Sequence, residues 1–299
     1  MTKFRDASGI SLTINHKKKK MNSRIKIINL EMNVSLACNL KCEYCSHFGR
    51  QMKGVIPLDE LSLWYKTWNH RIVPENVRIM GGEPLLHPNL IEIIAMTRND
   101  WPDSSVELIT NGLLVPKMSD GFFASILENE IKMTISRHFD GLEFDRLFES
   151  RIKILTGHGI KPNISQSDKS WRKYYRLNDQ GQAIPFQSDP VKAWQNCFVK
   201  KRCTTLLDNK LYRCPQLGCA VYAIQRGYLS SEWESVLNYQ PLMPDCSTEE
   251  LEVFVHQETC SQCSICPEKF EYADIYQKLN IFGLPIIQKV LCGGNHEST

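Results

Sequence analysis

The pattern of apolar and polar residues between positions 24 and 166 alternates between short strands and longer helices. Runs rich in β-branched residues and ended by turn formers predict strands at 25–30, 77–80, 106–110, 131–136 and 161–165. Stretches with apolar residues at helical spacing predict helices at 57–73, 88–99, 120–129 and 142–158. This rhythm predicts parallel β/α units with right-handed crossovers, and hence an α/β fold. A sixth strand is not evident from the pattern.

Three cysteines follow the first predicted strand in the spacing C-x3-C-x2-C: Cys38, Cys42 and Cys45. Three thiolates on one loop suit three corners of an iron–sulfur cube and leave one iron open. A structural zinc site lacking its fourth ligand, or three ordinary buried cysteines, are the alternative interpretations. The second predicted strand ends in Met80-Gly81-Gly82-Glu83-Pro84. Both motifs therefore lie at the carboxyl ends of strands, where the active sites of β/α barrels sit.

The order, spacing and flanks of these motifs resemble the radical S-adenosylmethionine (radical SAM) enzymes. In that family C-x3-C-x2-C follows the first barrel strand and G-G-E-P ends the second. The resemblance implies a partial (β/α)6-type TIM barrel. It also implies a 4Fe–4S cluster on Cys38, Cys42 and Cys45, whose open iron is chelated by the methionine end of SAM.

The resemblance also assigns contacts to SAM. Gly81 and Gly82 lack a Cβ, so their backbone can approach the cofactor closely. Glu83 is expected to accept a hydrogen bond from the SAM ammonium, and Pro84 to fix the turn. Tyr44 matches the family position beside the adenine.

Two further strand ends carry candidate residues. Thr110-Asn111-Gly112 resembles the T-N-G that ends the third strand of the family, although Asn-Gly is also an ordinary turn. Ser136 ends the fourth strand, where the family often places a polar group toward the SAM ribose; a serine there is also unexceptional. His138 follows at the same rim. We consider it a candidate general base, with a solvent-facing loop histidine as the alternative.

A second group of cysteines follows a polar stretch that reads as a linker or lid. They are Cys197, Cys203, Cys214, Cys219, Cys260, Cys263 and Cys266. The segment 206–212 predicts a hairpin with Asp-Asn at its turn, which would make Cys203 and Cys214 neighbours. Residues 247–250 form a capping box, which predicts a helix leading to the last three cysteines.

This half of the chain resembles the Twitch domain, the shortened form of the SPASM extension of radical SAM enzymes. There a hairpin and a later cysteine cluster ligate an auxiliary 4Fe–4S cluster. Asn209 stands where the family has a turn glycine, a mild change because Asn tolerates positive φ. We favour Cys203, Cys214, Cys263 and Cys266 as ligands, with Cys197 and Cys260 in reserve. A four-thiolate zinc site is the alternative.

Composition and charge favour a cytoplasmic protein. The net charge is +3 with 23% charged residues, so bulk charge does not imply a nucleic-acid partner. No apolar run reaches the roughly 18 to 20 residues of a membrane span, and the first twenty residues lack a signal-peptide core. The twelve cysteines cluster as metal thiolates do in a reducing compartment. We divide the chain into a disordered basic tail (1–23), barrel core (24–166), linker or lid (167–196) and Twitch-like domain (197–299).

The resemblance implies that a flavodoxin- or ferredoxin-type donor reduces the first cluster, which cleaves SAM to methionine and a 5′-deoxyadenosyl radical. That radical removes a hydrogen from a small-molecule substrate. The single-Twitch architecture resembles cyclitol and amino-sugar alcohol dehydrogenases such as 2-deoxy-scyllo-inosamine dehydrogenase. Epimerisation with Cys246 or Cys219 as hydrogen donor, peptide modification, and a non-catalytic electron carrier are the alternatives. The sequence does not name the substrate.

Overall fold

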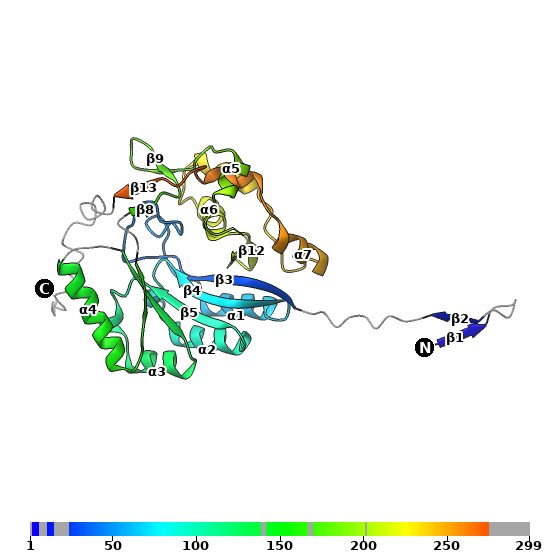
Figure 1. Cartoon of the computed structure of the whole chain (residues 1–299), viewed down its shortest axis with the longest axis horizontal. Helices are drawn as coiled ribbons and strands as arrows, with labels where there is room; N and C mark the ends of the chain where they lie inside the picture. The colour runs from blue at the N-terminus through cyan, green and yellow to red at the C-terminus, as the bar shows by residue number, and fades with distance from the viewer. Residues whose placement is uncertain are drawn as a thin grey trace.

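The computed structural model describes residues 2–5, 11–14, 24–138, 142–166, 170–200 and 202–274. A seven-stranded sheet with the order β12-β11-β3-β4-β5-β6-β7 organises the fold (Figure 1). Five strands pair in parallel and in chain order: β3 (Ile25–Ser35), β4 (Ile72–Gly81), β5 (Ser105–Thr110), β6 (Lys132–Arg137) and β7 (Asn163–Gln166). The predicted α/β fold with a parallel sheet is confirmed, and the described sheet is open, as in a partial barrel.

Helices connect successive strands: α1 (Leu58–Trp68), α2 (Leu90–Asp100), α3 (Asp120–Glu128) and α4 (Leu142–Gly157). Short 3₁₀ turns, η1 (Pro84–Leu86) and η2 (Val115–Lys117), follow β4 and β5. The predicted first helix ran to residue 73, but the observed one ends at Trp68. Ile72 and Val73 instead begin β4, where they pair with Ile25 and Lys26. Their apolar side chains fit both a helical and a strand pattern.

The two faces of β3 differ in polarity. Side chains alternate between faces along a strand, so Leu30, Met32 and Val34 share one face and Asn29, Glu31 and Asn33 the other. All six are buried. Helices α1 to α3 lie on one side of the sheet and α6 on the other (Figure 1). Asn33 donates to Cys219 of α6 (3.7 Å), so the polar face is the one covered by the second half of the chain.

The second half of the chain continues the same sheet. Strand β11 (Cys203–Leu207) pairs in parallel with β3 and antiparallel with β12 (Lys210–Tyr212). The predicted hairpin is therefore present, with Asp208 and Asn209 both at φ 55° in its turn. The boundary predicted at residue 197 does not separate two sheets. No local pattern signals such a long-range parallel pairing.

Of the remaining elements, α6 packs against this hairpin. The helices are α5 (Pro190–Gln195), α6 (Pro215–Gln225), η3 (Ser231–Asn238), α7 (Thr248–His256) and η4 (Ser261–Ile265). The predicted capping box opens α7. Strand β8 (Ser170–Arg172) pairs with β13 (Tyr272–Asp274), and β9 (Arg176–Leu177) with β10 (Ala183–Ile184). The predicted lid thus contains three short strands and a helix, and one of these strands pairs outside the lid.

The N-terminal segment differs from the predicted disordered tail where it is described. Strands β1 (Thr2–Arg5) and β2 (Ser11–Ile14) pair as an antiparallel hairpin. The lysine run at 17–20 lies outside the described residues. Among the described helices, none combines the length and apolar character needed to cross a membrane.

Candidate active site

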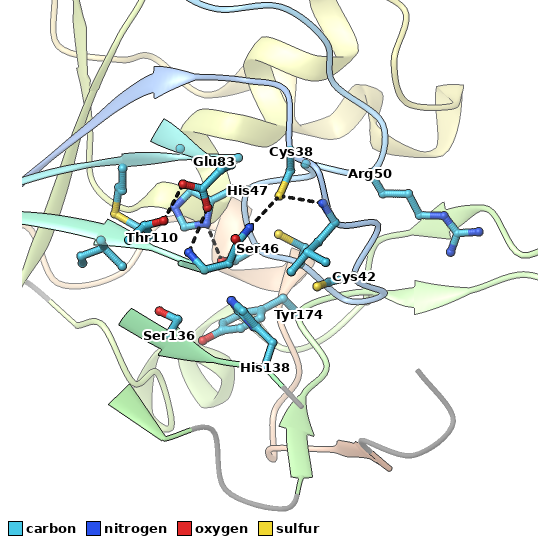
Figure 2. Close-up of a pocket in the computed structure, with 18 residues that line it drawn as sticks. Cys38, Cys42, Ser46, His47, Arg50, Glu83, Thr110, Ser136, His138 and Tyr174 are labelled. Carbon is cyan, nitrogen blue, oxygen red and sulfur yellow. Dashed lines mark hydrogen bonds between the residues drawn. The ribbon is translucent and has the colours of Figure 1, made fainter. Parts of the chain in front are cut away.

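A cavity of about 230 Å³ lies at the carboxyl ends of β3 to β6. Its lining includes residues predicted from each of these strand ends: Cys38, Cys42, Cys45, Gly81, Gly82, Glu83, Asn111, Ser136 and His138. Thr110, from the predicted T-N-G motif, also lines it, as do Arg50 and Tyr174, which sequence reasoning did not single out. Figure 2 shows Ser136, His138 and Tyr174 on one side of the cavity and Cys38 and Cys42 on the other. The fold therefore brings nine predicted residues to one place.

Gly81 and Gly82 bring the end of β4 against the cysteine loop. A Cβ on Gly81 would lie 2.0 Å from the Ser35 carbonyl oxygen, and one on Gly82 would lie 2.2 Å from that of Ala37. Gly81 also has φ 145°, which side chains rarely adopt. The Gly82 N–H donates to Ser35 O (2.7 Å) and the Glu83 N–H to Ala37 O (2.9 Å). The glycines thus permit close contact with the protein's own backbone, in addition to the predicted approach to SAM.

Glu83 joins the ends of β4 and β5. Its carboxylate accepts hydrogen bonds from Thr110 Oγ1 (2.6 Å), Asn111 N (2.9 Å) and Leu85 N (3.1 Å). Burial raises the pKa of Glu83 to about 7, and these hydrogen bonds limit the rise. The carboxylate also lines the cavity, so the predicted bond to an ammonium group remains available to its other lone pairs.

Cys38 is held by donors from two sides. The Leu40 N–H donates to its sulfur at 3.4 Å and Asn111 Nδ2 lies at 4.0 Å, while Asn111 also donates to Asn39 Oδ1 (2.7 Å). Burial, followed by the charge of Glu83, raises the pKa of the Cys38 thiol. A thiol in such surroundings is deprotonated most readily by a metal centre, as iron–sulfur ligation requires.

Cys45 lies beside His47, a residue that sequence reasoning did not assign. Burial favours the neutral thiol, but His47 and nearby backbone N–H groups outweigh this effect and lower the pKa of Cys45. Burial also opposes the charge on His47, but Cys45 and Glu31 outweigh it and raise the His47 pKa to about 10. The only sequence signal for this contact is that His47 stands two residues after a predicted ligand.

Tyr44 and Pro84 are not among the residues that line the cavity. Tyr44 adopts φ 56° and packs against Tyr175, with ring centroids 5.6 Å apart. Lys173 Nζ lies 5.5 Å from the Tyr44 ring. The structure thus places this ring against the predicted lid, and its position beside adenine remains a prediction. Pro84 is buried at the start of η1, where it fixes the turn after Glu83.

A second cavity is lined by five cysteines: Cys197, Cys214, Cys260, Cys263 and Cys266. Cys203, which we favoured as a ligand, is not among them. Its sulfur instead lies 3.7 Å from Arg78 and 3.8 Å from Asn29 on the polar face of the sheet. The hairpin register does point residue 203 toward residue 214. However, β12 ends at Tyr212 and α6 begins at Pro215, so the chain turns before that pair can form.

The thiols of this cavity lie close enough to affect one another's pKa values. Burial raises the pKa of Cys214 to about 12, with Cys197 and Cys263 adding to the shift. Burial and the same two thiols, together with Cys214, raise the pKa of Cys266. The Cys260 sulfur lies 3.8 Å from that of Cys263.

The donor chemistry of both cavities fits iron–sulfur clusters, because every candidate ligand is a thiol. Within the described part of the chain, no three Cys, His, Asp or Glu side chains converge as they would on a single metal ion.

Cys246 does not reach the first cavity. It lines a different cavity with Arg24, Ile25 and Arg71, and Arg71 donates to its carbonyl oxygen. These residues mark the starts of β3 and β4, whereas the first cavity lies at their ends. An eleven-residue strand rising about 3.3 Å per residue separates the two by roughly 30 Å. The hypothesis that Cys246 donates hydrogen to a substrate is therefore corrected.

The matches to known proteins agree with this site. Residues 32–133 match the Radical SAM superfamily, so the chain contains a radical SAM domain. The GTP 3′,8-cyclase of Stenotrophomonas maltophilia is 30% identical over 141 residues, which are 46% of this chain and 40% of the relative. The GTP 3′,8-cyclase of Helicobacter pylori is 30% identical over 154 residues, which are 50% of this chain and 44% of the relative. The chain thus spans less than half the length of these curated relatives.

Solved structures with partial likeness include BtrN in complex with AdoMet and 2-DOIA. It is 17% identical with a TM-score of 0.43, over 71% of this chain and 86% of that one. Streptococcus suis SuiB bound to S-adenosylmethionine is 12% identical with a TM-score of 0.36, over 80% and 68%. Both TM-scores lie below 0.5, so these likenesses do not define a substrate.

Proposed function

We propose that this radical SAM protein is an oxidoreductase that dehydrogenates an alcohol of a sugar or cyclitol and carries a second 4Fe–4S cluster as electron acceptor. The observation that carries the proposal is the second cavity, which is lined by Cys197, Cys214, Cys263 and Cys266 together with Cys260. Four thiolates would leave no iron open to substrate, which suits electron transfer.

Tyr174 links the two cavities. Its side chain lines the first cavity, and its carbonyl oxygen accepts a hydrogen bond from Gln216 (3.2 Å). Gln216 belongs to α6, the helix capped by Cys214. Burial raises the pKa of Tyr174, and the Cys266 and Cys197 thiols add to the shift, so these sulfurs are near the phenol. This arrangement supports a short path between substrate and second cluster.

In the first cavity, Cys38, Cys42 and Cys45 would hold the cluster that binds SAM. When both are bound, the cluster and SAM supply a radical able to remove a hydrogen atom from a substrate carbon. His138 and Tyr174 offer polar groups that would orient a hydroxylated substrate, while Ser136 would face the SAM ribose. Oxidation of an alcohol to a ketone also releases a proton and an electron, and His138 would take the proton.

The positions of the other cysteines favour oxidation over epimerisation. An epimerase needs a thiol that returns a hydrogen to the substrate carbon. The thiols on the described wall of the first cavity are those of the three predicted cluster ligands. Cys219 is fully buried on α6, where it accepts a hydrogen bond from Asn33, and Cys246 lies at the other end of the sheet.

The test uses anaerobically reconstituted protein with SAM, a reductant and a panel of aminocyclitols, amino sugars and GTP. GTP is included because the curated relatives are named for it. We expect 5′-deoxyadenosine and a product lighter by two hydrogens from one cyclitol or sugar. The Cys197→Ala/Cys214→Ala variant should still form 5′-deoxyadenosine but no product, whereas Cys260→Ala should form both. A cyclised GTP product, or an isomer carrying solvent deuterium, would overturn the proposal.

A further inference from the structure

A buried carboxylate, Glu31, lies on the polar face of β3 next to the active-site cavity. It is 5% exposed. Its Oε2 atom is 3.7 Å from His47 Nε2, and its Oε1 atom is 3.6 Å from an Arg78 nitrogen. His47 lines the cavity beside Cys45. Glu31 therefore links the cysteine loop to a row of charged residues, Glu31, Arg78 and Glu107, that crosses the sheet.

The charged row fixes Glu31 in place. Residues 31 and 78 are register partners on β3 and β4, and residues 78 and 107 on β4 and β5. Arg78 lies 3.4 Å from Glu107, which accepts a hydrogen bond from Thr134 (2.5 Å). Burying a carboxylate in a sheet is costly, and apolar residues of similar volume are often no less stable. A role beyond packing therefore accounts better for Glu31.

The contact between Glu31 and His47 is incomplete in a specific way. Glu31 Oε2 and His47 Nε2 are both buried without a hydrogen-bond partner, and they face each other. Closing their 3.7 Å separation to the roughly 2.8 Å of a charge-assisted bond needs a shift of about 1 Å. The other ring nitrogen, Nδ1, already lies 3.1 Å from Ser46 Oγ. The ring is thus held from both sides in the wall of the cavity that Cys45 also lines.

We propose that Glu31 is a positioning residue that fixes His47 beside Cys45, and that His47 thereby sets the reduction potential of the cluster on this loop. The inference rests on the proposed function for the first cluster. Hydrogen bonds to the sulfurs of an iron–sulfur cluster raise its potential. The negative charge of Glu31 alone would lower it. If Glu31 acts by positioning His47, removing its charge should lower the potential. If Glu31 acts only through its own negative charge, removing that charge should raise the potential.

The test is a redox titration of the reconstituted full-length protein, followed by electron paramagnetic resonance without substrate. The relevant signal is identified by its change on adding SAM. His47→Leu should shift the reduction equilibrium three- to tenfold toward the oxidised cluster, about 30 to 60 mV for one electron. His47→Gln, which keeps an N–H donor, should shift it less. Glu31→Gln should shift it in the same direction as His47→Leu.

Two further variants isolate the contact. Glu107→Gln removes a carboxylate from the same row without touching His47, and it should leave the potential unchanged. In the His47→Leu background, Glu31→Gln should lower the potential no further. A potential that rises or stays constant in Glu31→Gln overturns the proposal, and so does loss of this cluster from that variant. A wild-type protein that forms no SAM-responsive cluster contradicts the proposed function instead.

Discussion

Replacing Gly82 with alanine should push the G-G-E-P turn away from the cysteine loop. The new Cβ would lie 2.2 Å from the Ala37 carbonyl oxygen and 2.7 Å from that of Leu36. Real Cβ atoms essentially never come closer than 3.0 Å to such neighbours, so the backbones must separate by about 0.8 Å. Both contacts are with backbone atoms, and no flexible side chain can absorb the displacement.

The cost follows from the hydrogen bonds that join the two segments. The Gly82 and Glu83 N–H groups donate to Ser35 and Ala37 at 2.7 and 2.9 Å. Each buried backbone group left unpaired costs about 1 to 3 kcal/mol. We therefore expect Gly82→Ala to lower the free energy of unfolding by about 2 to 5 kcal/mol. At about 2 to 4 °C per kcal/mol, Tm should fall by roughly 4 to 20 °C.

The assay combines thermal unfolding, iron content and SAM cleavage of the reconstituted protein. Gly157→Ala is the matched control, because nothing lies within 4 Å of its Cβ and it sits at the end of α4. That variant should be as stable as the wild type or slightly more stable. If Gly82→Ala keeps the wild-type Tm and iron content, the close backbone contact does not hold the loop, and our account of the glycine is wrong.

Three further predictions concern individual side chains. Cys197→Ser should lower iron from about eight to about four per chain, whereas Cys203→Ser should retain about eight. Cys246→Ala should leave SAM cleavage and product formation unchanged, and a loss of product alone would restore it as a hydrogen donor. In cluster-free protein, the raised pKa of Glu83 means that protonation of this side chain stabilises the fold. That stabilisation is fully present below pH 4.5 and is lost as pH rises through about 7, so Tm should decline over this range. Glu83→Gln should remove this decline in Tm. If Tm depends on pH in the variant as it does in the wild type, the decline does not come from Glu83.

The elements of the barrel core could be predicted because each depends on local pattern. Strands β5 and β6 and helix α3 begin and end within one residue of the predicted bounds. The extent of β4 could not be predicted, because Ile72 and Val73 suit a helix or a strand equally. What decides between them is pairing with Ile25 and Lys26, which are nearly fifty residues away in sequence.

The candidate site divides in the same way. Residues in a spaced motif, such as Cys38 and Glu83, reach the cavity because they follow strands whose ends meet. Cys203 and Cys246 were misplaced because their positions depend on where β12 stops and on which end of the sheet the 244–247 segment meets. Tyr174 carries no sequence signal, since pairing of β8 with β13 brings its segment to the cavity.

The structural roles of Glu83 bear on how its variants are interpreted. Removing its side chain leaves Thr110 Oγ1 and the N–H groups of Asn111 and Leu85 without their acceptor. Glu83→Ala should therefore cost stability, about 1 to 3 kcal/mol for each buried group left unpaired. A loss of SAM binding in that variant would not distinguish a missing contact to SAM from a disturbed strand end. Glu83→Gln keeps the side-chain volume and one acceptor oxygen, but its NH2 group replaces the other acceptor, so Tm must be measured together with SAM affinity. If SAM affinity falls in the glutamine variant while Tm and iron content hold, the carboxylate charge acts on SAM; if affinity holds, Glu83 serves the strand ends.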